Sequence, residues 1–290
     1  RPMTHANSPD LWLHRYPWPQ AAGNKFDRGH AVIAGGAEMT GAARLAAFAA
    51  RRIGAGLVTL AVPAAAFPIY AAGAPGVIVK PLAVETAGDE EFQTYLSDPR
   101  RNASLVGPGL GLDSVARGRV LTALKSGKTT ILDADALSVF EDDPQILFSA
   151  ITGPCLLTPH EGEFRRLFSG TGDKLSRARD AARRSGAVVL LKGPDTVIAA
   201  PGGRAVINSG APPELATAGS GDVLAGFVLG LIAQGMDVFD AACAAAWLHG
   251  RAAAAFGPGL IAEDLPDMVL DQVRRLRQLS GDAQTPPEVP

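Results

Sequence analysis

Cysteine and net charge are both scarce in this chain, and each scarcity excludes a class of protein. The two cysteines, Cys155 and Cys243, lie far apart in apolar surroundings, which excludes a disulfide framework and indicates buried thiols in a reducing compartment. Lys and Arg number 27 against 29 Asp and Glu, so the formal net charge is −2. This balance indicates neither a nucleic-acid partner nor an acidic tail.

Long hydrophobic runs and a targeting segment are also missing. No uninterrupted apolar run reaches the roughly 20 residues that a membrane span requires. The first ten residues, RPMTHANSPD, lack the basic-then-apolar order of a signal peptide. Apolar residues nevertheless make up 47% of the chain, enough for a large core. We therefore expect a cytoplasmic protein without a membrane partner.

Short apolar runs alternate with amphipathic or alanine-rich stretches along most of the chain. Most runs lack polar alternation, which is typical of strands buried on both faces of a parallel sheet. The runs are residues 31–36, 57–63, 77–82, 104–109, 129–135, 155–160 and 187–193, and the helices between them are expected at 41–53, 115–126, 161–168 and 174–185. This alternation predicts an α/β fold with a doubly wound sheet.

The pattern changes near residue 194. Two short strands flank Pro-Gly-Gly in DTVIAAPGGRAVINSG (195–210), which predicts a hairpin. Three helices are expected after it, at 220–234, 237–256 and 265–278. With neither an internal repeat nor a linker, we predict one domain over 29–279, preceded by an irregular arm (1–28) and followed by a disordered tail (280–290).

Most of the predicted strands end in glycine or in a polar residue. In open parallel sheets, ligands bind outside the carboxyl ends of the strands, and glycine lets the backbone approach a ligand closely. The residues at these ends are Gly35, Gly36, Gly107, Gly109, Asp133, Asp135, Thr158, His160, Lys192 and Gly193. So many ends of this kind predict a single long crevice.

Several of these features also have simpler interpretations. GPGLG (107–111) is not GxGxxG and no GxxxxGK[ST] occurs, so a Rossmann dinucleotide site and a P-loop are poorly supported. By itself, GPGLG fits a turn as well as a ligand loop. Asp133 and Asp135 fit helix caps, an interpretation we favour for Asp135. No second His or Cys lies at ligand spacing from His160, which argues against zinc.

Two basic side chains are ambiguous in the same way. Lys192 ends the very apolar run AVVLL, so it either extends to the surface or meets a phosphate. His249 lies within an alanine-rich helix and is more typical of a packed histidine than of a ligand.

The stretch LATAGSGDVLAG (215–226) places a carboxylate on a glycine turn where a helix begins. Gly219 and Gly221 free the N–H groups of the helix N-terminus to face an anion, and a simple cap would not need two glycines and Ser220. An anion hole beside Asp222 suits phosphoryl transfer to a hydroxyl, with the amides holding the phosphate and the carboxylate taking the proton. We therefore favour Asp222 as a catalytic base over Asp222 as a cap.

The same stretch resembles the GxGD signature of ribokinase-like sugar and vitamin kinases, whose fold is a three-layer α/β sandwich with a mostly parallel central sheet and helices on both faces. Further segments follow the order of ADP-dependent NAD(P)H-hydrate dehydratases, and the similarity covers roughly residues 25–270. They are GHAVIAGGAEMTGAARLAAFAARRIGAGLVTLAVP (29–63), LVGPGLG (105–111), ILDADAL (131–137), LLTPHEGEF (156–164), LLKGPDTVI (190–198) and DAACAAAWLHGRAA (240–253). Single motifs of this set are shared with other kinases of the fold, whereas the TPHxGE pattern and residues 41–58 are more specific to the dehydratases.

The resemblance implies a metabolite repair enzyme. Hydrated NADH or NADPH carries a hydroxyl where water has added to the nicotinamide ring. The family phosphorylates that hydroxyl with ADP, or with ATP in eukaryotic relatives, and elimination of phosphate restores the cofactor. Mg²⁺ bridging the donor phosphates would offset their charge.

The resemblance also assigns roles by position. Asp222 is the implied base. The implied substrate contacts are Ala42, Gly109, His160 and Asp222; the implied nucleotide site comprises Lys192, Gly193, Pro194, Asp195, Thr196 and Gly221, to which the anion hole adds Gly219 and Ser220. Glu163 stands where related kinases have the glutamate that organises magnesium indirectly.

Some features leave alternatives open. Pro212-Pro213-Glu214 replaces the Gly- and Asn-rich lead-in common in the family. A kinase of the same fold would act on a vitamin precursor of the hydroxymethylpyrimidine, hydroxyethylthiazole or pyridoxal type, although such kinases more often have Asn where His160 stands. A non-catalytic nucleotide-binding protein would be expected to lack Asp222. The family further suggests a homo-oligomer, a tetramer, and an epimerase partner.

Overall fold

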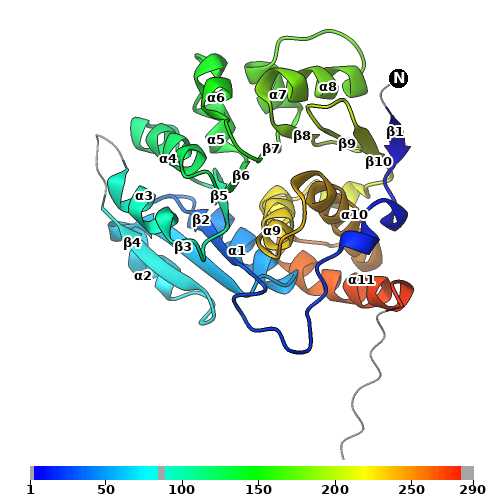
Figure 1. Ribbon diagram of the computed structural model, residues 1–290, viewed down its shortest axis with the longest axis horizontal. Coiled ribbons are helices and arrows are strands. Elements are labelled where there is room, and N and C mark those ends of the chain that lie inside the picture. The colour runs from blue at the N-terminus through cyan, green and yellow to red at the C-terminus, as the bar shows by residue number, and fades with distance from the viewer. Residues whose placement is uncertain (1–2, 84–88, 282–290) are drawn as a thin grey trace, which may run out of the picture.

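One sheet organises the computed structural model, which describes residues 3–83 and 89–281. Ten strands of the described chain pair in the order β1-β10-β9-β8-β7-β6-β5-β2-β3-β4. Their bounds are β1 (Thr4–Ala6), β2 (His30–Ala34), β3 (Leu57–Pro63), β4 (Ile78–Leu82), β5 (Ala103–Val106), β6 (Thr129–Leu132), β7 (Cys155–Leu157), β8 (Val188–Leu191), β9 (Thr196–Ala199) and β10 (Ala205–Asn208). Figure 1 shows the sheet crossing the molecule from β4 at one edge to β1 at the other.

The sheet is parallel except at β9, which runs antiparallel to both β8 and β10. The predicted hairpin around Pro-Gly-Gly is thereby confirmed, since β9 and β10 flank residues 200–204. Because β2 to β8 are all parallel, their carboxyl ends lie at the same edge of the sheet. The loops that follow these strands are therefore neighbours in space.

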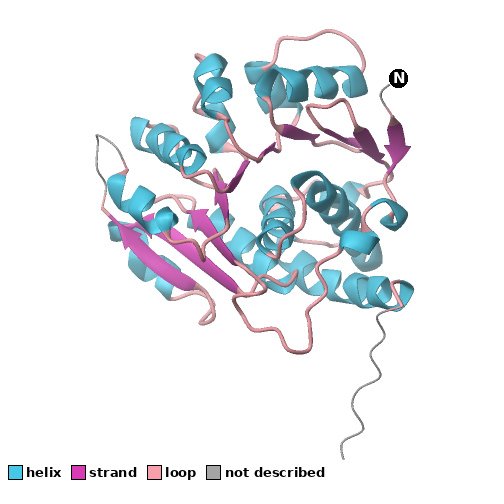
Figure 2. Ribbon diagram, in the orientation of Figure 1, coloured by secondary structure: helices cyan, strands magenta, loops and turns pink. Residues whose placement is uncertain are grey.

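Helices cover both faces, which confirms the predicted three-layer sandwich (Figure 2). Alternate strand residues enter opposite cores: Ile33 packs into one, whereas Val32 and Ala34 pack into the other. On the Ile33 side lie α1 (Thr40–Arg52), α2 (Phe67–Ala71), α9 (Ser220–Ala233), α10 (Val238–Phe256) and α11 (Leu265–Leu279). On the other lie α3 (Glu90–Ser97), α4 (Ser114–Lys125), α5 (Asp135–Ser138), α6 (Pro144–Ala150), α7 (Glu161–Leu167) and α8 (Lys174–Ser185).

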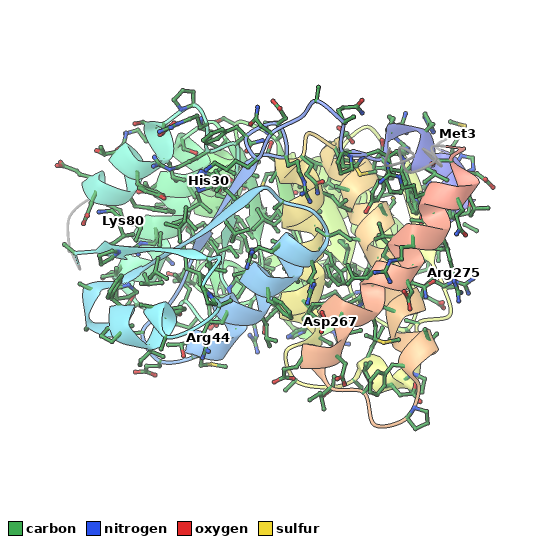
Figure 3. The ribbon with its side chains drawn as sticks, turned by 90° about the horizontal axis from the view of Figure 1, so that it is seen from below. Met3, His30, Arg44, Lys80, Asp267 and Arg275 are labelled. Atoms are coloured by element: carbon green, nitrogen blue, oxygen red, sulfur yellow. The ribbon has the colours of Figure 1, made fainter. Side chains whose placement is uncertain are left out.

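Helices α1 and α9 approach so closely that only glycine fits at their contact. A Cβ atom on Gly226 would lie 2.3 Å from the carbonyl oxygen of Ala46, and one on Gly230 would lie 2.6 Å from that of Ala50. The alanine-rich sequence of α1 presents the small surface that this approach requires. An ion pair of 2.7 Å between Arg52 and Asp267 also joins α1 to α11. Figure 3 shows the face on which these two helices lie, with Lys80 and Met3 toward opposite ends of the molecule.

The N-terminal arm differs from the sequence expectation. It is not irregular throughout, because Thr4–Ala6 form β1 and pair in parallel with Ala205–Ile207 of β10. Two short 3-10 helices follow, at Pro9–Leu11 and Leu13–Arg15. Trp12 between them is fully buried, with its ring 5.9 Å from that of Trp247 in an edge-on arrangement. The arm therefore extends the sheet as well as packing on the domain.

The other elements agree with the sequence analysis to within a few residues, although α2, α3, α5 and α6 were not expected. Cys155 and Cys243 are both buried and free, as predicted. Within the described ranges, no helix is long and apolar enough to cross a membrane. Helix α11 ends at Leu279, and residues 282–290 of the predicted tail lie outside the described residues.

Candidate active site

The loops after β2, β5 and β6 touch one another through glycine. A Cβ atom on Gly36 would lie 1.7 Å from the carbonyl oxygen of Gly109, and one on Gly107 would lie 1.7 Å from that of Asp133. Gly107 also has φ +132°, a conformation that other residues rarely adopt. The predicted convergence of the strand ends is confirmed for these three loops.

Asp133 follows β6 and is held by partners from the next strand ends. Its Oδ1 accepts a hydrogen bond of 2.8 Å from the hydroxyl of Thr158, which follows β7. The same oxygen lies 2.8 Å from Nζ of Lys192, which follows β8. The side chain of Asp133 is 2% exposed and that of Lys192 is 20% exposed, so a buried carboxylate meets a half-buried amine. The interpretation of Asp133 as a helix cap is therefore wrong. Its carboxylate joins the end of β6 to the ends of β7 and β8.

Asp135 does not cap a helix either. It is the first residue of α5, whose N-cap is Ala134, and its Oδ2 accepts a hydrogen bond of 2.9 Å from the backbone N–H of Gly111. It thus ties the loop after β6 to the GPGLG loop after β5.

Lys192 keeps its charge despite its position. Burial lowers the pKa of its amine, but the carboxylates of Asp133, Glu163 and Asp222 together raise that pKa above its usual value. A Cβ atom on Gly221 would lie 3.5 Å from its Nζ, so the amine lies beside the N-terminus of α9. A positive charge and the free N–H groups of a helix N-terminus thereby meet at one point, the arrangement that binds phosphate.

Asp222 lies in the first turn of α9 and does not cap it. The N-cap is Gly219, with φ +87°, and no side chain caps the helix. Burial and the nearby charge of Asp133 raise the pKa of Asp222 to about 7, against the opposing effect of Lys192. A carboxylate with a pKa near neutrality is suited to accept a proton from a hydroxyl.

A cavity of about 370 Å³ lies on the β8–β9 side of this turn. It brings together most of the residues predicted to bind the nucleotide, together with residues from β10, the loop before α9, α9 itself and α10. The predicted ones that line it are Lys192, Gly193, Pro194, Thr196, Ser220 and Gly221; the others are Asn208, Ala211, Pro212, Pro213, Leu215, Ala216, Leu224, Ala246, His249 and Gly250.

Two residues predicted for the nucleotide site do not line this cavity. Gly219 instead packs against α1 and the 3-10 helix Ala262–Asp264, and its Cβ would lie 2.6 Å from Cδ1 of Leu45. The exposed Asp195 turns its carbonyl oxygen to Nζ of Lys174, at 2.7 Å. Lys174 also donates to the carbonyl oxygen of Lys192 at 3.1 Å, so this lysine holds the loop after β8 in place. Sequence reasoning gave no role to Lys174.

His160 and Glu163 form a capping box at the start of α7. Nδ1 of His160 accepts hydrogen bonds from the backbone N–H groups of Gly162 and Glu163, at 2.9 and 3.3 Å. In return, Oε2 of Glu163 accepts from the backbone N–H of His160 at 2.8 Å. The His160 side chain remains 56% exposed. Glu163 is buried and contributes its charge to the surroundings of Lys192.

Ala42 and Gly109 lie on either side of Met39. The backbone N–H of Ala42 donates to the carbonyl oxygen of Met39 at 3.3 Å. Gly109 has φ +63°, and its Cβ would lie 2.3 Å from that same oxygen. The structure therefore brings Ala42 of the first turn of α1 and Gly109 of the loop after β5 together around the carbonyl group of Met39. Their contact with substrate stays a prediction.

His249 is a cavity residue that the sequence analysis set aside. Its Nε2 lies 2.9 Å from the carbonyl oxygen of Ser220, which can only accept, so Nε2 carries the proton. Burial lowers the pKa of this ring to about 4, which keeps it neutral. His249 is a packed histidine, as predicted, and its ring also lines the cavity. In the sequence, the one indication of a place at the site was that His249 lies in the segment 240–253, which resembles the family.

Comparisons with known proteins agree with this geometry. The family model described as NAD(P)H-hydrate dehydratase matches residues 30–274. An ADP-dependent (S)-NAD(P)H-hydrate dehydratase of Neisseria meningitidis is 37% identical over 252 residues, which cover 81% of each chain. A bifunctional NAD(P)H-hydrate repair enzyme of Moorella thermoacetica is 40% identical over 249 residues, covering 81% of this chain and 46% of that protein. The chain thus spans about half the length of the bifunctional relatives it matches.

Solved structures show the same fold. An ADP/ATP-dependent NAD(P)H-hydrate dehydratase of Bacillus subtilis, co-crystallised with ATP and Mg²⁺, superposes with a TM-score of 0.80 at 27% identity, covering 94% of this chain and 98% of that one. A ribokinase-like superfamily protein of Enterococcus faecalis superposes with a TM-score of 0.82 at 24% identity, covering 94% and 96%, and supports the fold. The chain therefore belongs to the NAD(P)H-hydrate dehydratase family and has its ribokinase-like fold.

Proposed function

We propose that this chain is an ADP-dependent (S)-NAD(P)H-hydrate dehydratase, which converts the S epimer of hydrated NADH or NADPH back to NAD(P)H. The observation that carries the proposal is the position of Asp222. Its carboxylate, with a pKa of about 7, lies in the first turn of α9 beside the cavity that Lys192 and Gly221 line. The relatives of Neisseria meningitidis and Bacillus subtilis carry this activity in their names.

The chemistry begins with the ring hydroxyl of the substrate. Asp222 accepts the hydroxyl proton while the oxygen attacks the terminal phosphorus of ADP, and AMP leaves with the electrons of the broken P–O bond. Phosphate is a far better leaving group than hydroxide. The bond between the nicotinamide ring carbon and the phosphorylated oxygen then breaks, and the phosphate leaves with its electron pair. Loss of a proton from the neighbouring ring carbon restores the double bond.

The nucleotide is proposed to lie in the 370 Å³ cavity. The N–H groups at the start of α9 and the amine of Lys192 would hold its phosphates, because a helix N-terminus and a cation both favour negative charge. Pro212, Leu224 and Ala246 supply apolar walls that suit a base ring. Pro212 and Pro213, which replace the Gly- and Asn-rich lead-in expected from the family resemblance, both line this cavity.

Magnesium fits this site as an ion carried by the donor phosphates. No group of three His, Cys, Asp or Glu side chains that could hold a metal occurs in the described part of the chain. Mg²⁺, however, commonly keeps several waters and takes one or two carboxylates plus substrate phosphates. Glu163 would hold the ion through water, since its Oε2 already accepts from the backbone of His160. When bound, the ion offsets the charge of the phosphates.

Substitution of the proposed base tests the function. We expect Asp222→Asn to lower kcat with ADP and hydrated NADH by about 10³-fold, the scale of a lost general base with its oriented substrate, while the Kd for ADP changes little. Asp135→Asn is the matched control, since it removes a nearby carboxylate that bonds the backbone of Gly111 and has the smallest of the effects on the pKa of Asp222, so its turnover at pH 8 should stay near that of wild type. Near-normal turnover by Asp222→Asn would refute the assignment of the base.

The partners and location remain part of the same proposal. We expect a homo-oligomer, a tetramer, in the cytoplasm. An epimerase that interconverts the two epimers of the hydrate is expected as a partner, because the bifunctional relatives are repair enzymes about twice as long as the matched segment.

A further inference from the structure

The N-terminal arm reaches the proposed nucleotide cavity through Asn7. Its Nδ2 donates to Oδ1 of Asn208 at 2.8 Å and to the carbonyl oxygen of Cys243 at 2.7 Å. Its Oδ1 accepts from Nε1 of the buried Trp12 at 3.1 Å, and its backbone N–H donates to the carbonyl oxygen of Ile207 at 2.8 Å. Both amide protons and the backbone donor of Asn7 are therefore engaged.

Asn208 is the partner that lines the cavity. It is the last residue of β10, is buried, and stands opposite Thr196, which lines the cavity from β9. With its Oδ1 accepting from Asn7, its Nδ2 faces the carbonyl oxygen of Ala246 on α10, at 3.5 Å. Loss of the Asn7 donor would leave a buried acceptor without its partner and free the amide of Asn208 to turn.

Asn7 also joins two elements that form different walls of the cavity. Through Ile207 and Asn208 it binds the end of β10, and through Cys243 it binds α10, which carries Ala246 and His249. Figure 1 shows β1 beside β10 with α10 next to them. The arm lies outside residues 30–274, the range that the family model matches. A segment beyond that range thus contributes to the wall of the cavity.

We propose that Asn7 is a positioning residue for nucleotide binding, which orients Asn208 and holds β10 against α10. The inference rests on the proposed function to the extent that the cavity is taken to bind ADP. Asn7 acts through its neighbours and does not enter the chemistry at Asp222. Its removal should therefore weaken the binding of ADP and leave the chemical step intact.

The test compares Asn7→Asp with wild type by titrating ADP in a calorimeter and by steady-state kinetics. Asp keeps the shape of Asn but presents acceptors to Oδ1 of Asn208 and the carbonyl oxygen of Cys243. We expect the Kd and the KM for ADP to rise about tenfold, with kcat within about twofold. His5→Ala is the matched control, because His5 is exposed on β1 and its loss leaves the contacts of Asn7 in place. It should match wild type.

A double-mutant cycle separates positioning from a general loss of stability. Because Asn7 acts in part through Asn208, adding Asn7→Ala to Asn208→Ala should weaken ADP binding by a smaller factor than Asn7→Ala does alone, and the remaining effect comes from its bond to Cys243. Additive losses, or a lower Tm with an unchanged Kd, would overturn the inference. If wild type itself neither binds ADP nor uses it, the proposed function fails as well; if wild type does both and Asn7→Asp equals it, only this inference fails.

Discussion

Nζ of Lys192 and Oδ1 of Asp133 lie 2.8 Å apart although their strands, β8 and β6, are separated by β7. Thr158 of the intervening strand end donates to the same carboxylate oxygen, so three successive strand ends meet at one atom. Asp222 faces this pair from α9, and its pKa responds to both members. The two charges of this ion pair therefore help to set the pKa of Asp222, the proposed base.

We expect Asp133→Asn to move the acid limb of the pH–rate profile to lower pH. Asp222 must be deprotonated to act, so turnover should fall as the pH drops through its pKa of about 7. Burial and the charge of Asp133 raise that pKa and Lys192 lowers it, so loss of Asp133 removes one raising effect while the lowering effect of Lys192 stays. The measurement is kcat/KM for hydrated NADH from pH 5 to 9. An acid limb that stays in place or moves to higher pH would contradict this prediction.

Asp222→Asn should be more stable than wild type at pH 8 but not at pH 4. The folded-state pKa of about 7 lies above the value near 3.9 of an unfolded chain. The native state therefore binds more protons between these values, and wild type loses stability as the pH rises through about 7. Since Asp222 is partly exposed, we expect a gain of about 1–2 kcal/mol at pH 8. Thermal unfolding of wild type and Asp222→Asn at both pH values measures this gain in stability. An equal gain at pH 4 and pH 8 would contradict the predicted pH dependence.

Gly219→Ala should cost more stability than Gly235→Ala. Both glycines have positive φ, +87° and +95°, so each substitution carries the left-handed strain of about 1 kcal/mol. Only at Gly219 would the new Cβ meet neighbours, 2.6 Å from Leu45 and 3.0 Å from Ala262, whereas it meets nothing at Gly235. Overpacking adds about 1–3 kcal/mol. Urea unfolding of the two variants compares them, and equal losses would show that the contact with α1 yields freely.

Gly226→Ala and Gly118→Ala should change stability in opposite directions, although both glycines lie inside helices. A Cβ atom on Gly226 would lie 2.3 Å from the carbonyl oxygen of Ala46, too close for contact. Helices α1 and α9 would have to separate, at a cost of about 1–3 kcal/mol in the free energy of unfolding. Gly118 of α4 has open space, and alanine there should add about 0.5–1 kcal/mol from its helix propensity. Chemical unfolding measures both. A stable Gly226→Ala would mean that the two helices do not need their close approach.

The sequence predicted the parallel strands and long helices well because their signal is local. A strand buried on both faces is apolar throughout, and helices such as α1 and α8 are long enough to show periodicity. Helices α2, α3, α5 and α6 have few residues, so their periodic signal is weak; α7 is equally short and was expected directly after the apolar run 155–160. Strand β1 has only three exposed residues, and its conformation is fixed by pairing with β10, some 200 residues later.

The start of α9 was predicted because local sequence governs it, whereas contacts that depend on distant partners were missed. The glycines and the carboxylate in residues 219–222 predicted this helix N-terminus, where Gly221 lies beside Lys192 and Gly219 packs against α1. That the turn binds phosphate stays a prediction. In contrast, Asp133 was taken for a possible cap because its partner Lys192 lies 59 residues away. His249 was taken for a packed residue because its bond to Ser220 exists only in three dimensions. Such pairings cannot be found from spacing alone.

The reaction itself is tested most directly by incubating the chain with the S epimer of hydrated NADH, ADP and Mg²⁺. The absorbance of the reduced nicotinamide is followed while AMP and phosphate are quantified, with ATP as a parallel donor. We expect NADH to be recovered with one AMP and one phosphate formed for each NADH. Failure to recover NADH with either donor, or recovery without release of AMP or ADP from the donor, would contradict the proposed function.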